Sequence, residues 1–365
     1  MKPINLVNTF VLSCIFFGTF FGTTVLTEES ITLVSWGGSY QKACQEGYFN
    51  SFEEATGIKI NVTEFNGGLA QVRVQVESGN VQWDIVDIES QDNIIGCDEG
   101  LLEPLDELEL PDGPDGTPAE EDFFDGAITD CAVATIVWST VVAYNADTYE
   151  SNPPTTMADF FDLEKYPGKR GIRRTPEVIL EFALIADGVP VDEVYDTLAT
   201  DEGVDRAFAK LDEIKDELVI WEAGAQPPQL LADQEVVMTT AYNGRIFNAQ
   251  TVEKQPFVII WDGQVRDYSQ WAIVTGSPNL ENALKFIQHA SRSESQAGVA
   301  NRISYGPVRH SAWELVGKHV PTGIDMRPHM PTSPDNSKNV LTNDAEWWAE
   351  HKDELTERFS AWLSN

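Results

Sequence analysis

The stretch that decides the fold covers residues 31–65 and reads ITLVSWGGSYQKACQEGYFNSFEEATGIKINVTEF. Its first six residues are largely β-branched and predict a strand at 31–36, which a Gly-Gly pair ends in a tight turn. Ser39 is placed to cap a helix that Gly57 stops, and an alternating strand follows at 58–65. The order strand, helix, strand predicts an α/β fold with a parallel sheet.

The same alternation continues along the chain, interrupted by an acidic loop rich in Pro and Gly at 103–125. Apolar periodicity predicts further helices at 69–78, 93–99, 156–161, 176–186, 191–198, 203–218, 279–290 and 344–363. Short β-branched or apolar runs predict further strands at 84–88, 132–144, 218–221, 236–241, 257–261 and 270–275. The strand at 132–144 is long enough to leave one domain and enter another.

Charge excludes some classes of partner. The chain has 365 residues, of which 59 are acidic and 24 basic, so its formal net charge is −35. A length of this size predicts two or three domains. Nucleic-acid binding is not expected, because it requires a basic face that neutralises phosphates, and neither is docking on an anionic membrane surface.

The N-terminus is typical of an export signal. Lys2 is its only basic residue, and the uncharged, mostly apolar run at 10–26 is 17 residues long. This layout predicts a signal peptide at 1–26 and a periplasmic mature protein; a retained membrane anchor is the weaker alternative, because 17 residues barely span a bilayer.

Four cysteines are present, and Cys14 lies within the predicted signal peptide. In an oxidising compartment one disulfide and one free thiol are expected from the other three. Cys97 and Cys131 lie at the ends of predicted elements, so we favour a disulfide between them. Three buried, reduced thiols are the alternative.

No catalytic or cofactor motif stands out. The five histidines form no ligand-spaced pair, and the chain lacks the phosphate loop, the dinucleotide fingerprint and the G-x-S-x-G elbow. The sequence therefore predicts no metal site, no cofactor and no enzymatic activity. Aromatic and polar residues instead gather at the ends of predicted strands, where open α/β sheets bind ligands.

At these residues the chain resembles the solute-binding proteins of ABC importers, in the branch that binds spermidine, putrescine or 4-aminobutyrate. The resemblance extends over nearly the whole mature chain and rests on the succession ITLVSWGGSY, WDIVDIES, EGLLEPLD, WSTVVAYN, VVMTTAYNGR, QWAIVTGSPNLENALKFIQ and YGPV. It implies a two-lobed periplasmic binding protein fold (type II) with the ligand between the lobes. It also implies a monomer that delivers its ligand to an ABC permease with a partner ATPase.

By this resemblance, lobe 1 covers 29–144 plus 268–306 and lobe 2 covers 145–267 plus 307–365. The ligand-binding residues that it implies are Trp36, Gly38, Ser39, Tyr40, Glu89, Ser90, Trp138, Arg174, Tyr242, Arg245, Asp267 and Tyr268. Trp221, Trp347 and Trp348 are expected only to pack.

The chain departs from polyamine binders where arginines replace carboxylates that would bind amines. An arginine in a dry cleft requires a carboxylate partner. We therefore expect a zwitterionic ω-amino acid whose carboxylate binds Arg245 and whose ammonium binds Asp267 or Glu89, with aromatic rings against its methylenes. A polyamine ligand stays open, as do a role in presenting ligand to a signalling receptor and an enzyme built on this fold.

Overall fold

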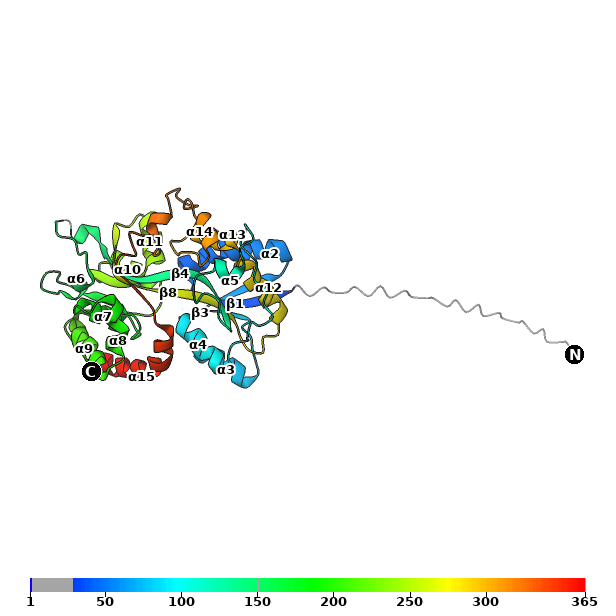
Figure 1. The fold of residues 1–365 in the computed structure, drawn as a ribbon, viewed down its shortest axis with the longest axis horizontal. Coiled ribbons are helices and arrows are strands. Elements are labelled where there is room, and N and C mark those ends of the chain that lie inside the picture. The colour runs from blue at the N-terminus through cyan, green and yellow to red at the C-terminus, as the bar shows by residue number, and fades with distance from the viewer. Residues whose placement is uncertain (2–28, 150, 365) are drawn as a thin grey trace.

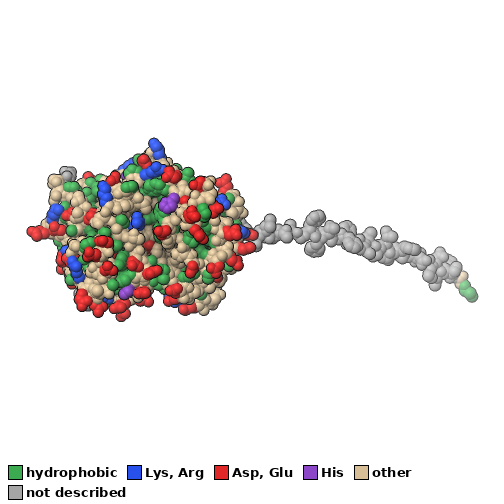
Figure 2. All heavy atoms as spheres, viewed as in Figure 1, with side chains coloured by type: hydrophobic (Ala, Val, Ile, Leu, Met, Phe, Trp, Pro, Cys, Tyr) green, Lys and Arg blue, Asp and Glu red, His purple; other side chains and the backbone are tan. Residues whose placement is uncertain are grey.

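The computed structural model describes residues 1, 29–149 and 151–364, so the predicted signal peptide lies almost wholly outside the described residues. The described chain forms two α/β lobes side by side, with strands β4 and β8 crossing between them (Figure 1). Acidic side chains outnumber basic ones on the face in Figure 2, in keeping with the net charge.

Within the described residues, one mixed sheet of nine strands runs through both lobes. Its order is β2-β1-β3-β8-β4-β7-β5-β6, with β9 paired to β8. The strands are β1 Ser30–Ser35, β2 Lys59–Glu64, β3 Ile85–Glu89, β4 Ala132–Asn145, β5 Arg170–Arg173, β6 Leu218–Trp221, β7 Met238–Tyr242, β8 Phe257–Ile273 and β9 Val340–Thr342. Pairing is parallel among β2, β1 and β3 and among β7, β5 and β6. Strand β8 pairs antiparallel with β3 and β4 and parallel with β9, and β4 also pairs antiparallel with β7. The expected parallel sheet is thus present within each lobe and is replaced by antiparallel pairing where the lobes join.

The centre of the sheet is made by two long strands. The long strand expected at 132–144 is confirmed as β4, which is 14 residues long and buried throughout. The prediction of two separate strands at 257–261 and 270–275 is wrong, because a single strand of 17 residues, β8, covers the first and continues through the second as far as Ile273. Polar residues at 262–269 interrupt the apolar pattern there, although the backbone continues to pair with β4.

Each side of the crossing has its own hydrophobic core. One core takes residues from 31–138 and 271–308, and the other takes residues from 142–265 and 341–359. The predicted lobe boundaries stay a prediction. Val308, which that prediction gives to lobe 2, lies in the first core, and the adjacent Arg309 pairs with Asp122 at 2.6 Å.

Helices cover both faces of the sheet (Figure 1). The helix after β1 is continuous, with a π-helical turn between α1 and α2. The α-helices are α1 Gly38–Cys44, α2 Asn50–Thr56, α3 Ala70–Ser78, α4 Ser90–Asp98, α5 Ala119–Asp122, α6 Met157–Phe161, α7 Ile179–Ala186, α8 Val194–Leu198, α9 Asp201–Asp212, α10 Gln226–Ala232, α11 Asn243–Thr251, α12 Leu280–Ala290, α13 Ser293–Ala300, α14 His310–Glu314 and α15 Ala345–Ser364. Among the described residues, no helix combines the length and apolarity that a membrane span requires. Helix α5 lies within the segment expected to be a loop, and β5, α10, α11 and α13 were not expected from the sequence.

The disulfide between Cys97 and Cys131 is confirmed, with their Cα atoms 5.8 Å apart. It ties the last turn of α4 to the chain just before β4. Cys44 is a buried free thiol.

Replacing both Cys97 and Cys131 by Ala is expected to lower the free energy of unfolding by about 3–4 kcal/mol, because the bridge restricts the unfolded chain across 34 positions. Urea unfolding of the purified protein measures this difference. Cys44→Ala is the matched control and is expected to cost only about 1 kcal/mol. Equal losses in the two proteins would contradict a stabilising disulfide.

Candidate functional site

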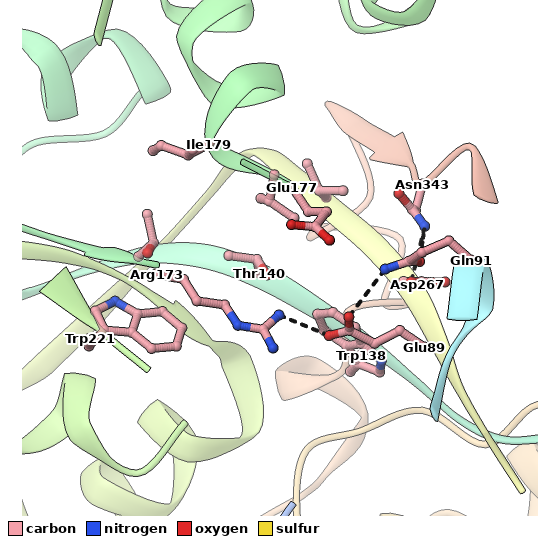
Figure 3. Close-up of a pocket in the computed structure, with 13 residues that line it drawn as sticks. Glu89, Gln91, Trp138, Thr140, Arg173, Glu177, Ile179, Trp221, Asp267 and Asn343 are labelled. Atoms are coloured by element: carbon pink, nitrogen blue, oxygen red, sulfur yellow. Dashed lines mark hydrogen bonds and ion pairs between the residues drawn. The ribbon is translucent and has the colours of Figure 1, made fainter. Parts of the chain in front are cut away.

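The candidate site is a pair of adjoining cavities where the two lobes meet. The larger cavity encloses about 490 Å³, including space open to solvent, and is lined by Glu89, Gln91, Trp138, Thr140, Arg173, Glu177, Val178, Ile179, Trp221, Thr240, Val265, Asp267 and Asn343 (Figure 3). The smaller encloses about 320 Å³ and is lined by Trp36, Tyr40, Glu89, Ile136, Trp138, Tyr242, Arg245, Ser269 and Tyr305. Glu89 and Trp138 line both, so the two cavities are neighbours.

An ion pair between the lobes lies at the centre of the site. Arg173 ends β5 in one lobe, Glu89 ends β3 in the other, and Arg173 Nη1 lies 3.0 Å from Glu89 Oε1 (Figure 3). Both side chains are largely buried, and Gln91 donates a further hydrogen bond to Glu89 at 3.2 Å. Burial opposes the charge of Arg173, but the nearby Tyr242 and Glu89 outweigh that cost and raise the pKa of its guanidinium.

Aromatic rings surround this ion pair. The guanidinium carbon of Arg173 lies 5.7 Å from the ring centroid of Trp36 and 5.8 Å from that of Tyr242, within the range of cation–π attraction. The Tyr242 ring in turn makes edge contacts with Trp138 at 5.1 Å and Trp221 at 5.7 Å. Such faces suit alkyl chains and cations.

The Arg245 side chain links the two lobes by donating hydrogen bonds to backbone carbonyls of the opposite lobe. It lies near the start of α11, is 4% exposed, and donates from Nη1 to the carbonyl of Gly37 at 2.7 Å and from Nη2 to that of Trp36 at 3.0 Å. Its Nε–H is buried and has no hydrogen-bond partner among the described residues. The side chain passes so close to α1 that a Cβ on Gly38 would lie 2.5 Å from Nη1.

Asp267 projects from β8 into the larger cavity. Its Oδ1 accepts hydrogen bonds from Ser90 Oγ at 2.6 Å and from the Tyr268 amide at 2.7 Å, and its Oδ2 accepts one from Asn343 at 3.1 Å. Burial raises the pKa of this carboxyl to about 7, against the opposing effect of the Ser90 hydrogen bond. Near neutral pH the Asp267 carboxyl is therefore present in both its protonated and its ionised form.

The structure brings most of the expected ligand-binding residues together. Those that line the cavities are Trp36, Tyr40, Glu89, Trp138, Tyr242, Arg245 and Asp267. Ser90 and Tyr268 line an adjoining groove that also reaches Asp267, and Gly38 and Ser39 line a hollow on the far side of Arg245. Their contact with a ligand stays a prediction.

Arg174 is placed differently from the rest of the expected set. It lines neither cavity and instead pairs with Glu222 at 2.7 Å, and both side chains are more than half exposed. Its neighbour Arg173 occupies the cavity.

Several lining residues were missed from the sequence. They are Arg173, Glu177, Gln91, Tyr305 and Asn343. Trp221, expected only to pack, also lines the larger cavity, whereas Trp348 does pack and is fully buried. The signal for Arg173 was present, because it stands directly beside Arg174, which the resemblance placed among the ligand-binding residues. Among the described residues, no group of three or more His, Cys, Asp or Glu side chains is arranged to hold a metal ion.

Two α/β lobes that meet over a cavity with both signs of charge and aromatic walls define a protein that encloses a small polar solute. The chain belongs to the bacterial extracellular solute-binding protein family, whose model matches residues 47–332. The prediction of a solute-binding protein that is not an enzyme is thereby confirmed.

Three similar proteins support this assignment. A gamma-aminobutyric acid-binding protein of Pseudomonas aeruginosa is 43% identical over 336 residues, which cover 92% of this chain and 91% of that protein. The crystal structure of PBP MotA from A. tumefaciens B6 in complex with glucopine has a TM-score of 0.83 at 32% identity and covers 92% of this chain and 99% of that one. The Atu4243–GABA receptor structure has a TM-score of 0.77 at 29% identity and covers 92% and 98%. The two-lobed fold expected from the sequence is confirmed.

The close approach of Arg245 to α1 is testable at Gly38. Gly38→Ala is expected to lower the free energy of unfolding by about 2 kcal/mol more than Gly79→Ala, because its methyl group displaces a buried, charged hydrogen-bond donor. Gly79 is a matched control, with φ +63° against +59° and open space where its Cβ would be. Urea unfolding compares the two, and equal losses would mean that Arg245 adjusts freely.

The raised pKa of Asp267 predicts that the free energy of unfolding depends on pH. Its pKa is raised to about 7 from 3.8, so the folded state holds a proton that the unfolded state releases between those values. The stabilisation that the Asp267 carboxyl gives to the folded state is therefore complete below pH 3.8 and is lost as the pH rises through about 7. The free energy of unfolding of Asp267→Asn should fall less over this range than that of the unsubstituted protein. Buried Asp87 and Glu181, whose pKa values are raised by burial too, remain in both proteins and cancel. Identical pH profiles would contradict the assignment.

Proposed function

We propose that this protein is the solute-binding component of an ABC importer for a small zwitterionic ω-amino acid such as 4-aminobutyrate. One observation carries the proposal: an arginine and a glutamate, one from each lobe, pair at 3.0 Å inside the cavity. Together these two side chains offer one partner for a carboxylate and one for an ammonium.

A zwitterion can replace this ion pair charge for charge. Its carboxylate would bind the guanidinium of Arg173 and its ammonium would bind Glu89, so neither side chain is left buried without a partner. A buried charge that loses its partner costs several kcal/mol, so a ligand with only one sign of charge is disfavoured. The rings of Trp36 and Tyr242, already close to Arg173, would pack against the methylenes.

The contacts expected from the sequence fit the same scheme. In the part of the chain that the structure describes, the buried Nε–H of Arg245 has no partner, and Arg245 lines the smaller cavity, so this group can donate a hydrogen bond to the ligand carboxylate in addition to that from Arg173. Asp267 and Glu89 both line the larger cavity, where the ammonium would lie. Trp138 lines both cavities, and Tyr40 lines the smaller.

Similar proteins support the ligand class. The relative that is 43% identical is a gamma-aminobutyric acid-binding protein, and one similar solved structure is a GABA receptor. Export through the signal peptide at 1–26, a periplasmic monomer, and delivery to a permease driven by an ATPase complete the proposal. A disulfide between Cys97 and Cys131 is consistent with an oxidising compartment.

A polyamine is the second candidate, favoured by one observation. Glu89, Glu177 and Asp267 all line the larger cavity, against the single cation of Arg173. A diamine could be bound by two of these carboxylates, but it would bring a further positive charge beside Arg173.

Calorimetric titration of the purified protein tests the proposal. It should bind 4-aminobutyrate at least about 10-fold more tightly than putrescine, because only the zwitterion satisfies Arg173. Arg173→Ala is expected to weaken 4-aminobutyrate binding by roughly 100-fold, because a charged hydrogen-bonded pair in a dry site is lost.

Arg174→Ala is the matched control, since Arg174 is the adjacent arginine and its ion pair with Glu222 is exposed. It should change the affinity by less than about 2-fold. Tighter binding of putrescine than of any ω-amino acid would overturn the assignment of the ligand.

A further inference from the structure

Helix α15 carries a lysine on the face that it buries. Its residues Trp348, Leu355 and Phe359 lie in the core of its own lobe. Lys352 lies four positions after Trp348 and three before Leu355, so it shares that face of the helix. Only 19% of its side chain is exposed. A lysine at a position where the helical pattern favours an apolar residue needs partners for its charge.

Both partners of this lysine are buried carboxylates, and they belong to different lobes. The Lys352 Nζ lies 2.6 Å from Asp92 Oδ1 and 3.4 Å from Glu177 Oε1, and the two carboxylate side chains are 2% and 9% exposed. Asp92 is in the first turn of α4, directly after β3, whereas Glu177 lies between β5 and α7 in the lobe that contains α15. The ammonium therefore spans the cleft, and its shorter contact is with the opposite lobe.

Both ends of the contact between Lys352 and Asp92 are fixed to their own lobes. The Gly68 amide donates to Asp92 Oδ2 at 3.2 Å, and the disulfide between Cys97 and Cys131 ties down the end of α4. Helix α15 is anchored by its core residues and lies against α4 where the lobes meet (Figure 1). Opening of the cleft would therefore separate Lys352 from Asp92.

Lys352 keeps its charge in this setting. Burial opposes ionisation, but the nearby Asp92, Glu177 and Glu89 outweigh that cost and raise the pKa of the ammonium. When the lobes separate, Glu177 stays beside the ammonium, since both belong to the same lobe. Lys352 thus has one carboxylate partner in the open form, and closure adds a second.

This contact is separate from those that a ligand would replace. Arg173, Glu89 and Arg245 also join the lobes, and all three line the cavities. Lys352 and Asp92 line neither cavity. A ligand in the site can therefore leave the ion pair between them intact, and the pair can form without any ligand.

We infer that the ion pair between Lys352 and Asp92 is a latch that holds the lobes closed for part of the time even without ligand. A contact that stabilises the closed form raises the apparent affinity for any ligand that this form encloses. A contact that must break before the cleft opens also slows release of the ligand. The effect on closure is independent of the function proposed above, whereas the effect on the affinity for an ω-amino acid rests on it.

Small-angle X-ray scattering of the purified protein without ligand tests the latch. Lys352→Met retains a long side chain and removes its charge, so its radius of gyration should exceed that of the unsubstituted protein. Arg358→Met is the matched control, because Arg358 lies on the same helix and pairs at 2.6 Å with Asp205 of its own lobe. Its radius of gyration should be unchanged. Equal radii for all three proteins would overturn the inference.

Calorimetric titration of 4-aminobutyrate gives a second readout. Lys352→Met should weaken binding roughly 10-fold, because the closed form loses a contact between the lobes. Arg358→Met should change the affinity by less than about 2-fold. Equal affinities of Lys352→Met and the unsubstituted protein would contradict the latch. If the unsubstituted protein binds no ω-amino acid, the proposed function fails, and the scattering comparison still decides whether the latch exists.

A double variant separates the ion pair from independent effects of its two residues. Lys352→Met/Asp92→Asn should be no more open than Lys352→Met, because both changes break the same contact. Radii of gyration that increase additively would mean that the two residues act separately and would overturn the inference. If Lys352→Met does not fold, Asp92→Asn replaces it with the same expected increase in radius, since the amide keeps the shape of the carboxylate without its charge.

Discussion

Everything in the site depends on a constraint of electrostatics: a charge removed from water needs a partner. The lobes meet over a buried guanidinium, and Arg173 finds its partner on the opposite lobe, in Glu89. Arg245 satisfies the same requirement with backbone carbonyls across the cleft. In the site, the contacts that satisfy Arg173 and Arg245 therefore also join the lobes, and under the proposed function the guanidinium that binds the ligand carboxylate is one of those that link the two lobes.

The fold could be predicted largely from local patterns, because apolar periodicity and turn residues are local properties of the chain. The strand-helix-strand unit at 31–65 and the long strand β4 are confirmed, although the N-cap of α1 is Gly37 and not the expected Ser39. The division of β8 into two strands was wrong for a physical reason. Its middle carries polar residues with different tasks: Asp267 lines the cavity, whereas Gln264 donates to the carbonyl of Asn336. A polar stretch in a strand is indistinguishable from a loop until the partner strand is known.

The site was harder to predict, because a residue's role there depends on direction and burial. Arg173 is the last residue of β5 and Arg174 is the first residue beyond it, and their side chains part where the strand ends: Arg173 lines the cavity, and Arg174 pairs with the exposed Glu222. That strand is four residues long and rich in arginine, so the sequence did not reveal it and could not choose between the two. Glu177 is one of 59 acidic residues, and its place in the lining of the larger cavity becomes apparent only in the fold.

The strands that cross between the lobes couple the unfolding of one lobe to that of the other. Strands β4 and β8 share one hydrogen-bonded ladder that begins in one core and ends in the other, with irregularities in register near Thr140 and Ala134. If one lobe unfolded alone, the hydrogen bonds between β4 and β8 would have to break partway along the strands. The lobe that stayed folded would then expose apolar surface. Unfolding of the two cores is thus thermodynamically coupled, and heating should produce one cooperative unfolding transition instead of two successive ones.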